Sequence, residues 1–190
     1  MKKIIWPLLL CAVLCGCGGG ETGNAVQEQY RTLETARLEA EVTSHTSTDS
    51  RTFTLLCSYD ADGDAVTTVT APSELAGLTA VVSGADMTLS SEGLQLPAGA
   101  SLDICPANCL PYLLRALADG YVLEQSSEVL DDTPCLRLAL DTTAPGGGKV
   151  LCAVWLDAEG LFPRYAEFSR NEQVVLTVKL LAFTCTTSEG

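Results

Sequence analysis

The cysteines are the side chains of this chain whose type and spacing could do chemistry. The sequence contains nine of them, and Cys105 and Cys109 stand at i and i+4. This spacing would put both thiols on one helix face, as half of a site for a soft metal ion. No second pair of this spacing and no nearby histidine completes four ligands, so we expect no metal site. A disulfide between these two would be strained in a regular helix, because the two Cβ vectors run nearly parallel.

Other catalytic groups are scarce. The single histidine, His45, lies in a polar stretch with no obvious partner and is expected to be a solvated loop residue. The chain has no Gly-x-Ser-x-Gly elbow and no His-Glu-x-x-His zinc motif. Its many carboxylates fall at turns and on the outer faces of the alternating segments, where contact with solvent is enough to explain their presence. We therefore expect neither enzymatic activity nor a cofactor.

The first residues have the layout of a secretory leader. Two lysines precede the apolar run Ile4–Leu14, which is shorter than the roughly 20 apolar residues that span a bilayer. The sequence Leu14-Cys15-Gly16-Cys17 then resembles the lipobox of bacterial lipoproteins. The resemblance implies cleavage after Gly16, a diacylglycerol on the Cys17 thiol and an acyl chain such as palmitate on its amine. An ordinary cleaved signal peptide is the alternative.

The chain is expected to contain one domain. We assign residues 1–16 to a signal peptide, 17–24 to a lipidated, glycine-rich tether and 25–190 to a single domain, which is long enough to bury a substantial core. The formal net charge is −13, and loss of the two leader lysines makes the mature chain more acidic. Such a surface repels nucleic acid and anionic lipid headgroups. Attachment to the outer face of the cell membrane, or to the outer membrane of a two-membrane cell, would therefore depend on the acyl chains.

Disulfides are a further possibility in an exported domain. Six cysteines lie outside the leader and are not expected to carry lipid: Cys57, Cys105, Cys109, Cys135, Cys152 and Cys185. An oxidising compartment favours at least one disulfide among them, with a pairing that the sequence does not determine. The alternative is that they are small buried hydrophobes, the usual role of free cysteine. Cys57 and Cys152 are expected in the interior in either case, because they share strand faces with apolar neighbours.

Apolar residues recur with a helical period in two segments. Val26, Tyr30 and Leu33 predict a helix over about 25–35. A second helix is predicted before Gly120, with an apolar face formed by Leu110, Leu113, Leu114 and Leu117.

Elsewhere apolar and polar residues alternate in short segments with turn signals between them. This pattern predicts eleven strands, at 36–43, 53–59, 65–71, 78–83, 87–90, 94–96, 121–130, 135–140, 149–156, 164–169 and 173–184. Asp60–Asp64 is interpreted as a hairpin turn, because an EF-hand would need glutamate where Ala71 stands. The expected fold class is α+β and mostly β: a curved antiparallel sheet, or half-open barrel, covered by two helices.

This arrangement resembles the lipoprotein-carrier fold of the Lol periplasmic carrier and its outer-membrane receptor, LolA and LolB. The resemblance is nearest to a lipoprotein branch of spore-forming, single-membrane bacteria that includes a clostridial spore-germination lipoprotein. It covers most of Gln27–Cys185 and is carried by Tyr59–Gly63 with Thr68–Pro72, Glu74–Leu78, Cys109–Leu114, and Trp155–Asp157 with Leu161–Phe168. It implies an eleven-stranded half-open barrel plugged by helices, with an apolar hollow that receives acyl chains.

The apolar face of the second helix has two interpretations. It is either ordinary core packing or a lid over a ligand-binding hollow, in which burial of an acyl chain contributes about 0.8 kcal/mol per methylene. In the second case the expected ligand-binding residues are Phe53, Leu55, Leu110, Leu113, Leu114, Leu117, Val154, Trp155 and Phe183.

Two hypotheses about function follow. The first is a non-enzymatic, membrane-anchored surface lipoprotein that binds a lipid or another apolar ligand in its half-barrel. The second is an interaction scaffold that holds a cell-wall enzyme near the membrane. The resemblance to the germination lipoprotein implies an amidase of spore-cortex peptidoglycan as one partner. A packed interior and an exposed strand edge would favour the second hypothesis.

Overall fold

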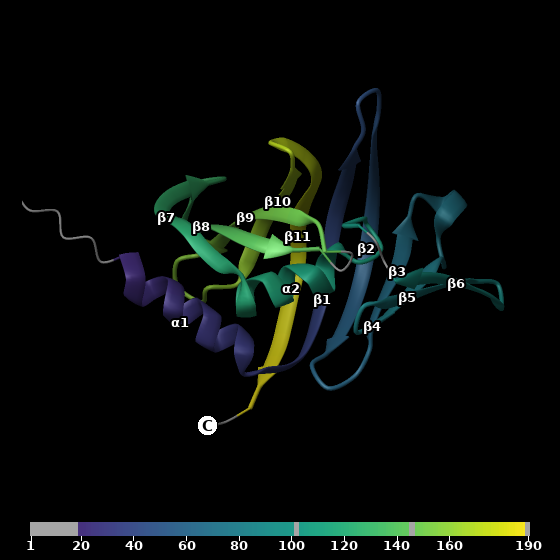
Figure 1. The fold of residues 1–190 in the computed structure, drawn as a ribbon, viewed down its shortest axis with the longest axis horizontal. Coiled ribbons are helices and arrows are strands. Elements are labelled where there is room, and N and C mark those ends of the chain that lie inside the picture. Colours follow the sequence, from purple (N-terminus) through teal and green to yellow (C-terminus); the bar gives the residue numbers. More distant parts are fainter. Residues whose placement is uncertain (1–18, 101–102, 145–146, 189–190) are drawn as a thin grey trace, which may run out of the picture.

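The predicted number of strands and helices is confirmed by the computed structural model, which describes residues 19–100, 103–144 and 147–188 (Figure 1). The elements in chain order are α1 (Gly19–Arg31), β1 (Leu33–His45), β2 (Ser50–Asp60), β3 (Ala65–Ala71), the short 3₁₀ turn η1 (Ser73–Leu75), β4 (Thr79–Ser83), β5 (Asp86–Ser91), β6 (Leu94–Ala100), α2 (Cys109–Asp119), β7 (Tyr121–Leu130), β8 (Thr133–Thr143), β9 (Lys149–Asp157), β10 (Pro163–Arg170) and β11 (Gln173–Thr187).

The strands form one antiparallel sheet of eleven strands in the order β6-β5-β4-β3-β2-β1-β11-β10-β9-β8-β7. Each half of the chain is a meander, and the ladder between β1 and β11 joins the halves, from Leu33 opposite Thr187 to Ser44 opposite Leu176. Because β6 and β7 do not pair with each other, the sheet stays open. The predicted fold class, a curved and unclosed sheet with two helices, is thus confirmed.

The core lies on the concave face of the sheet, where α2 packs (Figure 1). Side chains of a strand point alternately to its two faces, so Leu38, Ala40 and Val42 of β1 are buried while their neighbours Arg37 and Glu41 are exposed. Leucines of α2 and Val26 and Tyr30 of α1 join the same apolar cluster. The two helices therefore fill the curve of one sheet.

Polar contacts fix α2 at both ends of the curve. Arg115 Nη1 on α2 donates a hydrogen bond to Gly84 O in the turn between β4 and β5, at 3.0 Å. Arg170 at the end of β10 forms an ion pair with Asp103, in the segment that leads into α2. The helix is thus tied to strands from both halves of the sheet.

Helix α1 differs from the prediction at both of its ends. It begins at Gly19 rather than near Ala25, so residues 19–24, expected to be tether, are helical, and it ends at Arg31, two residues before β1 begins. The leader, Cys17 and the rest of the expected tether lie outside the described residues. Within the described part of the chain, no helix has the length and apolar character needed to cross a membrane.

Candidate functional site

Most of the predicted ligand-binding residues come together on the concave face. Six are buried in the single large apolar cluster: Leu55, Leu110, Leu113, Leu114, Leu117 and Val154. Phe53 and Phe183 are partly buried and pack against the same cluster. The leucine face of α2 therefore packs directly on the sheet, and a ligand could touch these leucines only if α2 moved.

Trp155 lies on the opposite, convex face, because it follows the concave residue Val154 in β9 and successive side chains alternate. Its indole Nε1 donates to Glu128 Oε2 at 2.7 Å, and the Arg137 guanidinium lies 5.3 Å from the ring centroid. The ring of Tyr165 on β10 packs against it with centroids 5.3 Å apart. The expectation that Trp155 lines the hollow was wrong. Its contacts instead form a cross-strand row that ties β7 to β10.

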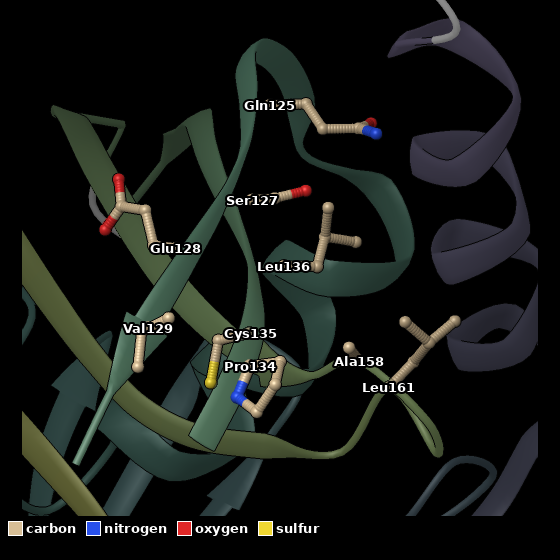
Figure 2. Close-up of a pocket in the computed structure, with 9 residues that line it drawn as sticks. All are labelled: Gln125, Ser127, Glu128, Val129, Pro134, Cys135, Leu136, Ala158 and Leu161. Carbon is tan, nitrogen blue, oxygen red and sulfur yellow. The ribbon is translucent and has the colours of Figure 1, made fainter. Parts of the chain in front are cut away.

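A hollow of about 510 Å³ lies at one end of the concave face (Figure 2). We call it the β7–β8 pocket, and its lining residues are Gln125, Ser127, Glu128, Val129, Pro134, Cys135, Leu136, Ala158 and Leu161. In register, Ser127 stands opposite Leu136 and Val129 opposite Pro134. Since Leu136 belongs to the core cluster, these side chains share the concave side of the sheet.

The turn between β9 and β10 supplies another wall of the pocket. Asp157 accepts hydrogen bonds from the backbone N–H groups of Gly160, at 2.6 Å, and Phe162, at 3.0 Å. Leu161 between them has a left-handed φ of 57°, a conformation that costs a branched side chain free energy and needs such support. The carboxylate of Asp157 therefore fixes the turn that presents Leu161 to the pocket.

Helix α1 borders the pocket along its length. Near its end, Gln29 Nε2 donates to Gly160 O at 3.2 Å and the Tyr30 hydroxyl donates to Leu161 O at 3.0 Å. Nearer its start, a Cβ on Gly23 would lie 3.1 Å from Gln125 Oε1, and Figure 2 shows Gln125 pointing toward this helix. Gln125 Oε1 is buried without a hydrogen-bond donor, a condition that costs about 1–3 kcal/mol. The pocket thus has apolar walls and an unsatisfied acceptor beside α1.

A second hollow, of about 500 Å³, includes one predicted residue. Its lining consists of Ser44, Thr46, Thr48, Asp49, Arg51, Phe53 and Pro106. These residues come from the β1–β2 hairpin and from the segment before α2. Most of its lining residues have polar side chains, and Arg51 pairs with Asp49 at 3.8 Å between Nε and Oδ2. Phe53 is therefore the predicted ligand-binding residue that does reach an open hollow.

His45 is the last residue of β1 and is half-buried, so it is not the solvated loop residue expected. Its ring nitrogens lie near two hydroxyls: Nδ1 is 3.1 Å from Ser50 Oγ and Nε2 is 3.3 Å from Thr177 Oγ1. It thereby connects β1 with β2 and β11. Nowhere in residues 19–100, 103–144 and 147–188 do three or more His, Cys, Asp or Glu side chains gather in a way that could hold a metal ion.

The six cysteines of the domain are free thiols in this structure. The disulfide favoured from the sequence is not formed there, and the arrangement matches the alternative of small buried hydrophobes. Cys57 and Cys152 are interior, as predicted, and Cys109 is buried with them. Burial raises the pKa of the Cys57 thiol to about 11. Burial also raises the pKa of Cys109 well above its usual value.

These raised thiol pKa values make stability depend on alkaline pH. The folded state holds the Cys57 proton that the unfolded state releases near pH 9.0, so the stabilisation is complete below pH 9 and is lost as the pH rises toward 11. A shift of this size corresponds to about 3 kcal/mol. We expect the free energy of unfolding, measured in urea, to fall across this window and to fall less steeply in Cys57→Ala. Equal slopes would contradict a protonated, buried Cys57.

No family model matches the chain, and no curated protein sequence matches it significantly. Solved structures do match. An uncharacterized conserved protein from Thermus thermophilus has a TM-score of 0.54 and 8% identity, covering 89% of this chain and 88% of that one. A DUF1329 family protein from Desulfovibrio piger has a TM-score of 0.52 and 13% identity, covering 90% of this chain and 94% of that one. At these identities the similarity shows the fold alone.

Other solved structures match with TM-scores below 0.5. They include a LolA superfamily protein from Nitrosomonas europaea and a putative outer membrane lipoprotein-sorting protein domain from Vibrio parahaemolyticus, with TM-scores of 0.45 and 0.49. A chain in the complex of the CwlD amidase with the GerS lipoprotein from Clostridioides difficile has a TM-score of 0.38 and 17% identity, covering 94% of this chain and 96% of that one. These scores are too low to support an inference about ligand or partner.

Proposed function

We propose that the protein is an exported lipoprotein, anchored to the outer face of a membrane by acyl chains on Cys17, that binds a lipid or another apolar ligand on the concave face of its sheet. The observation that carries the proposal is the β7–β8 pocket, a hollow on the face where the fold buries apolar side chains. The lipobox-like sequence before the domain supports the anchor.

The chemistry of the pocket suits a ligand with an apolar body and one polar end. Its volume of about 510 Å³ falls within the range of roughly 300–1,000 Å³ typical of small-molecule sites. Val129, Leu136 and Leu161 provide apolar surface, whose burial against each methylene contributes about 0.8 kcal/mol. Gln125 and Ser127 stand at the α1 end of the lining, where a polar group would find hydrogen-bond partners.

The nine residues expected from the sequence have a different part in this proposal. The four α2 leucines, Leu55 and Val154 belong to the packed core cluster, which Leu136 of the pocket also joins, and Phe53 belongs to the second hollow.

Replacing Val129 with Asp tests the pocket, because this side chain is exposed and lines it, so the fold tolerates the change. A charge placed against an acyl chain loses its hydration, and we expect at least about a tenfold loss of fatty-acid affinity. Native mass spectrometry of the full chain with added palmitate measures the occupancy. The matched control is Val174→Asp on β11, an exposed valine outside the pocket lining, which should bind like the unaltered protein. A ligand-free unaltered protein would overturn the proposal.

The exposed edge strand β6 favours a second candidate function, that of an interaction scaffold for a cell-wall enzyme. Leu94 and Leu96 are strongly exposed on this strand, and among the described strands only β5 pairs with it. Such an edge can accept an added strand from another chain. Affinity purification from cells should then recover a peptidoglycan enzyme, and Leu94→Asp should reduce that recovery. Recovery unchanged by the substitution would exclude the β6 edge as the contact.

A further inference from the structure

Strand β7 starts with large apolar side chains that are open to solvent. Tyr121 is 73% exposed and Leu123 is 54% exposed. They flank Val122, which is half-buried and packs against the core cluster. A register shift between Val122 and Glu124 releases Leu123 from the regular ladder. β7 is an edge strand of the sheet, and among the described strands only β8 pairs with it.

Helix α1 runs along this exposed segment. Gln27 Nε2 donates to Gly120 O at 2.6 Å, directly before Tyr121. A Cβ on Gly23 would lie 3.7 Å from Val122 Cγ2. Gln27 therefore lies beside Gly120, and Gly23, one turn earlier in α1, lies beside Val122. The exposed side chains Tyr121 and Leu123 are thus next to the N-terminal half of the helix.

The chain length places this segment close to the proposed anchor. Cys17 precedes the helix start at Gly19 by two residues, which span at most about 7 Å. From Gly19 to Gly23 the helix advances by about 6 Å, at roughly 1.5 Å per residue. The contact between Gly23 and Val122 is thus at most about 13 Å from the lipidated residue. Since helix replaces the expected flexible tether, the anchor cannot hold this end of the domain far from the bilayer.

We propose that the apolar start of β7, defined by Tyr121 and Leu123, docks on the outer leaflet of a lipid bilayer beside the Cys17 anchor. The inference rests on the proposed anchor and deepens it by giving the domain an orientation. Tyrosine is a side chain that favours the membrane–water interface, and leucine adds apolar area that can enter the headgroup boundary. In this orientation the β7–β8 pocket, whose Gln125 and Ser127 belong to the same strand, opens next to the bilayer, which makes membrane lipid the source of its ligand.

The charges around this surface indicate which lipid headgroups it would favour. Glu124 is exposed on β7, and Asp119 at the end of α2 pairs with Arg31 of α1 at 3.6 Å between Nε and Oδ1. With few basic groups to attract anionic headgroups, the surface fits a zwitterionic leaflet better than an anionic one.

Tryptophan quenching tests the orientation in the full lipidated chain. Tyr121→Trp and Leu94→Trp are compared, each with Trp155→Phe so that the mature chain carries one tryptophan. Leu94 on β6 is the matched control, because it is 73% exposed, as Tyr121 is, and lies on the opposite edge of the sheet (Figure 1). On phosphatidylcholine nanodiscs containing doxyl-labelled lipid, we expect at least about threefold stronger quenching at position 121 than at position 94.

Each outcome has a definite meaning. Equal quenching at both positions on loaded nanodiscs would overturn the docking and leave the anchored, ligand-binding lipoprotein intact. Failure of the lipidated chain to associate with nanodiscs at all would overturn the anchor and the docking together. Hydrogen exchange of the unaltered protein gives an independent reading: amides of residues 121–123 should exchange more slowly on nanodiscs, whereas those of residues 94–96 should not change.

Discussion

Replacing Cys17 with Ala is expected to move the protein from the membrane fraction to the soluble fraction, by about 100-fold or more in its partition. Each buried methylene of an acyl chain contributes about 0.8 kcal/mol, and two or three chains hold a protein firmly where one chain binds only marginally. The strongly acidic chain offers no electrostatic substitute for them. Fractionation of cells followed by detection of the protein in each fraction measures the change.

The control for this substitution lies two residues away. Cys15→Ala alters a cysteine inside the expected leader and should leave the protein in the membrane fraction. The intact mass of the purified protein should show no attached lipid in Cys17→Ala and should equal that of the lipidated, unaltered protein in Cys15→Ala. A Cys17→Ala protein that remains in the membrane fraction would show that another part of the chain supplies the attachment.

Replacing Phe168 with Ala is expected to destabilise the fold by about 3–5 kcal/mol, the usual loss for a buried phenylalanine. Phe168 is 0% exposed in the core. Its ring meets Tyr112 of α2 edge-on, with centroids 5.8 Å apart. The substitution therefore removes the packing between α2 and the sheet as well as buried area. Urea unfolding followed by circular dichroism gives the loss.

Phe162→Ala is the matched control for the core substitution. Phe162 is 40% exposed and packs on Phe183 at a centroid distance of 5.4 Å. The same chemical change there should cost less, about 1–2 kcal/mol, because a large part of the ring is already exposed to solvent. Equal losses at the two positions would mean that the curve of the sheet is not a packed core.

The sheet could be predicted because its strands alternate cleanly. Apolar and polar residues take turns along β1, and Asp and Gly mark hairpins such as the one between β2 and β3, where Asp62 N donates to Asp60 Oδ1 at 3.0 Å. Such signals are local, and they identified the strands and the fold class. The start of α1 was not predicted because its first turns contain glycines, including Gly19 and Gly23. Each glycine weakens a helix by about 1 kcal/mol relative to alanine. The close approach of Gly23 to Gln125 favours a residue without Cβ, and this contact between distant parts of the chain is not visible in the local sequence.

The candidate pocket was missed for a related reason. Gln125 and Ser127 alternate with residues of the other face of β7, but they are polar where a covered strand would carry apolar side chains. Polar residues on the concave side of an edge strand are the signal that could have located the pocket. The placement of Trp155 could have been corrected from the sequence, because Val154 and Trp155 are adjacent in one strand and must point to opposite faces.

The ladder between β1 and β11 has a consequence for the order of folding. It pairs Leu33 with Thr187, whereas the other ladders join strands that are neighbours in sequence. The two meanders can therefore form quickly from local contacts, while the ladder that unites them must close a loop of most of the chain, which is slow. Until β11 pairs with it, β1 presents an unpaired edge on this side. A chain with this topology completes its core only after its last strand has joined the sheet.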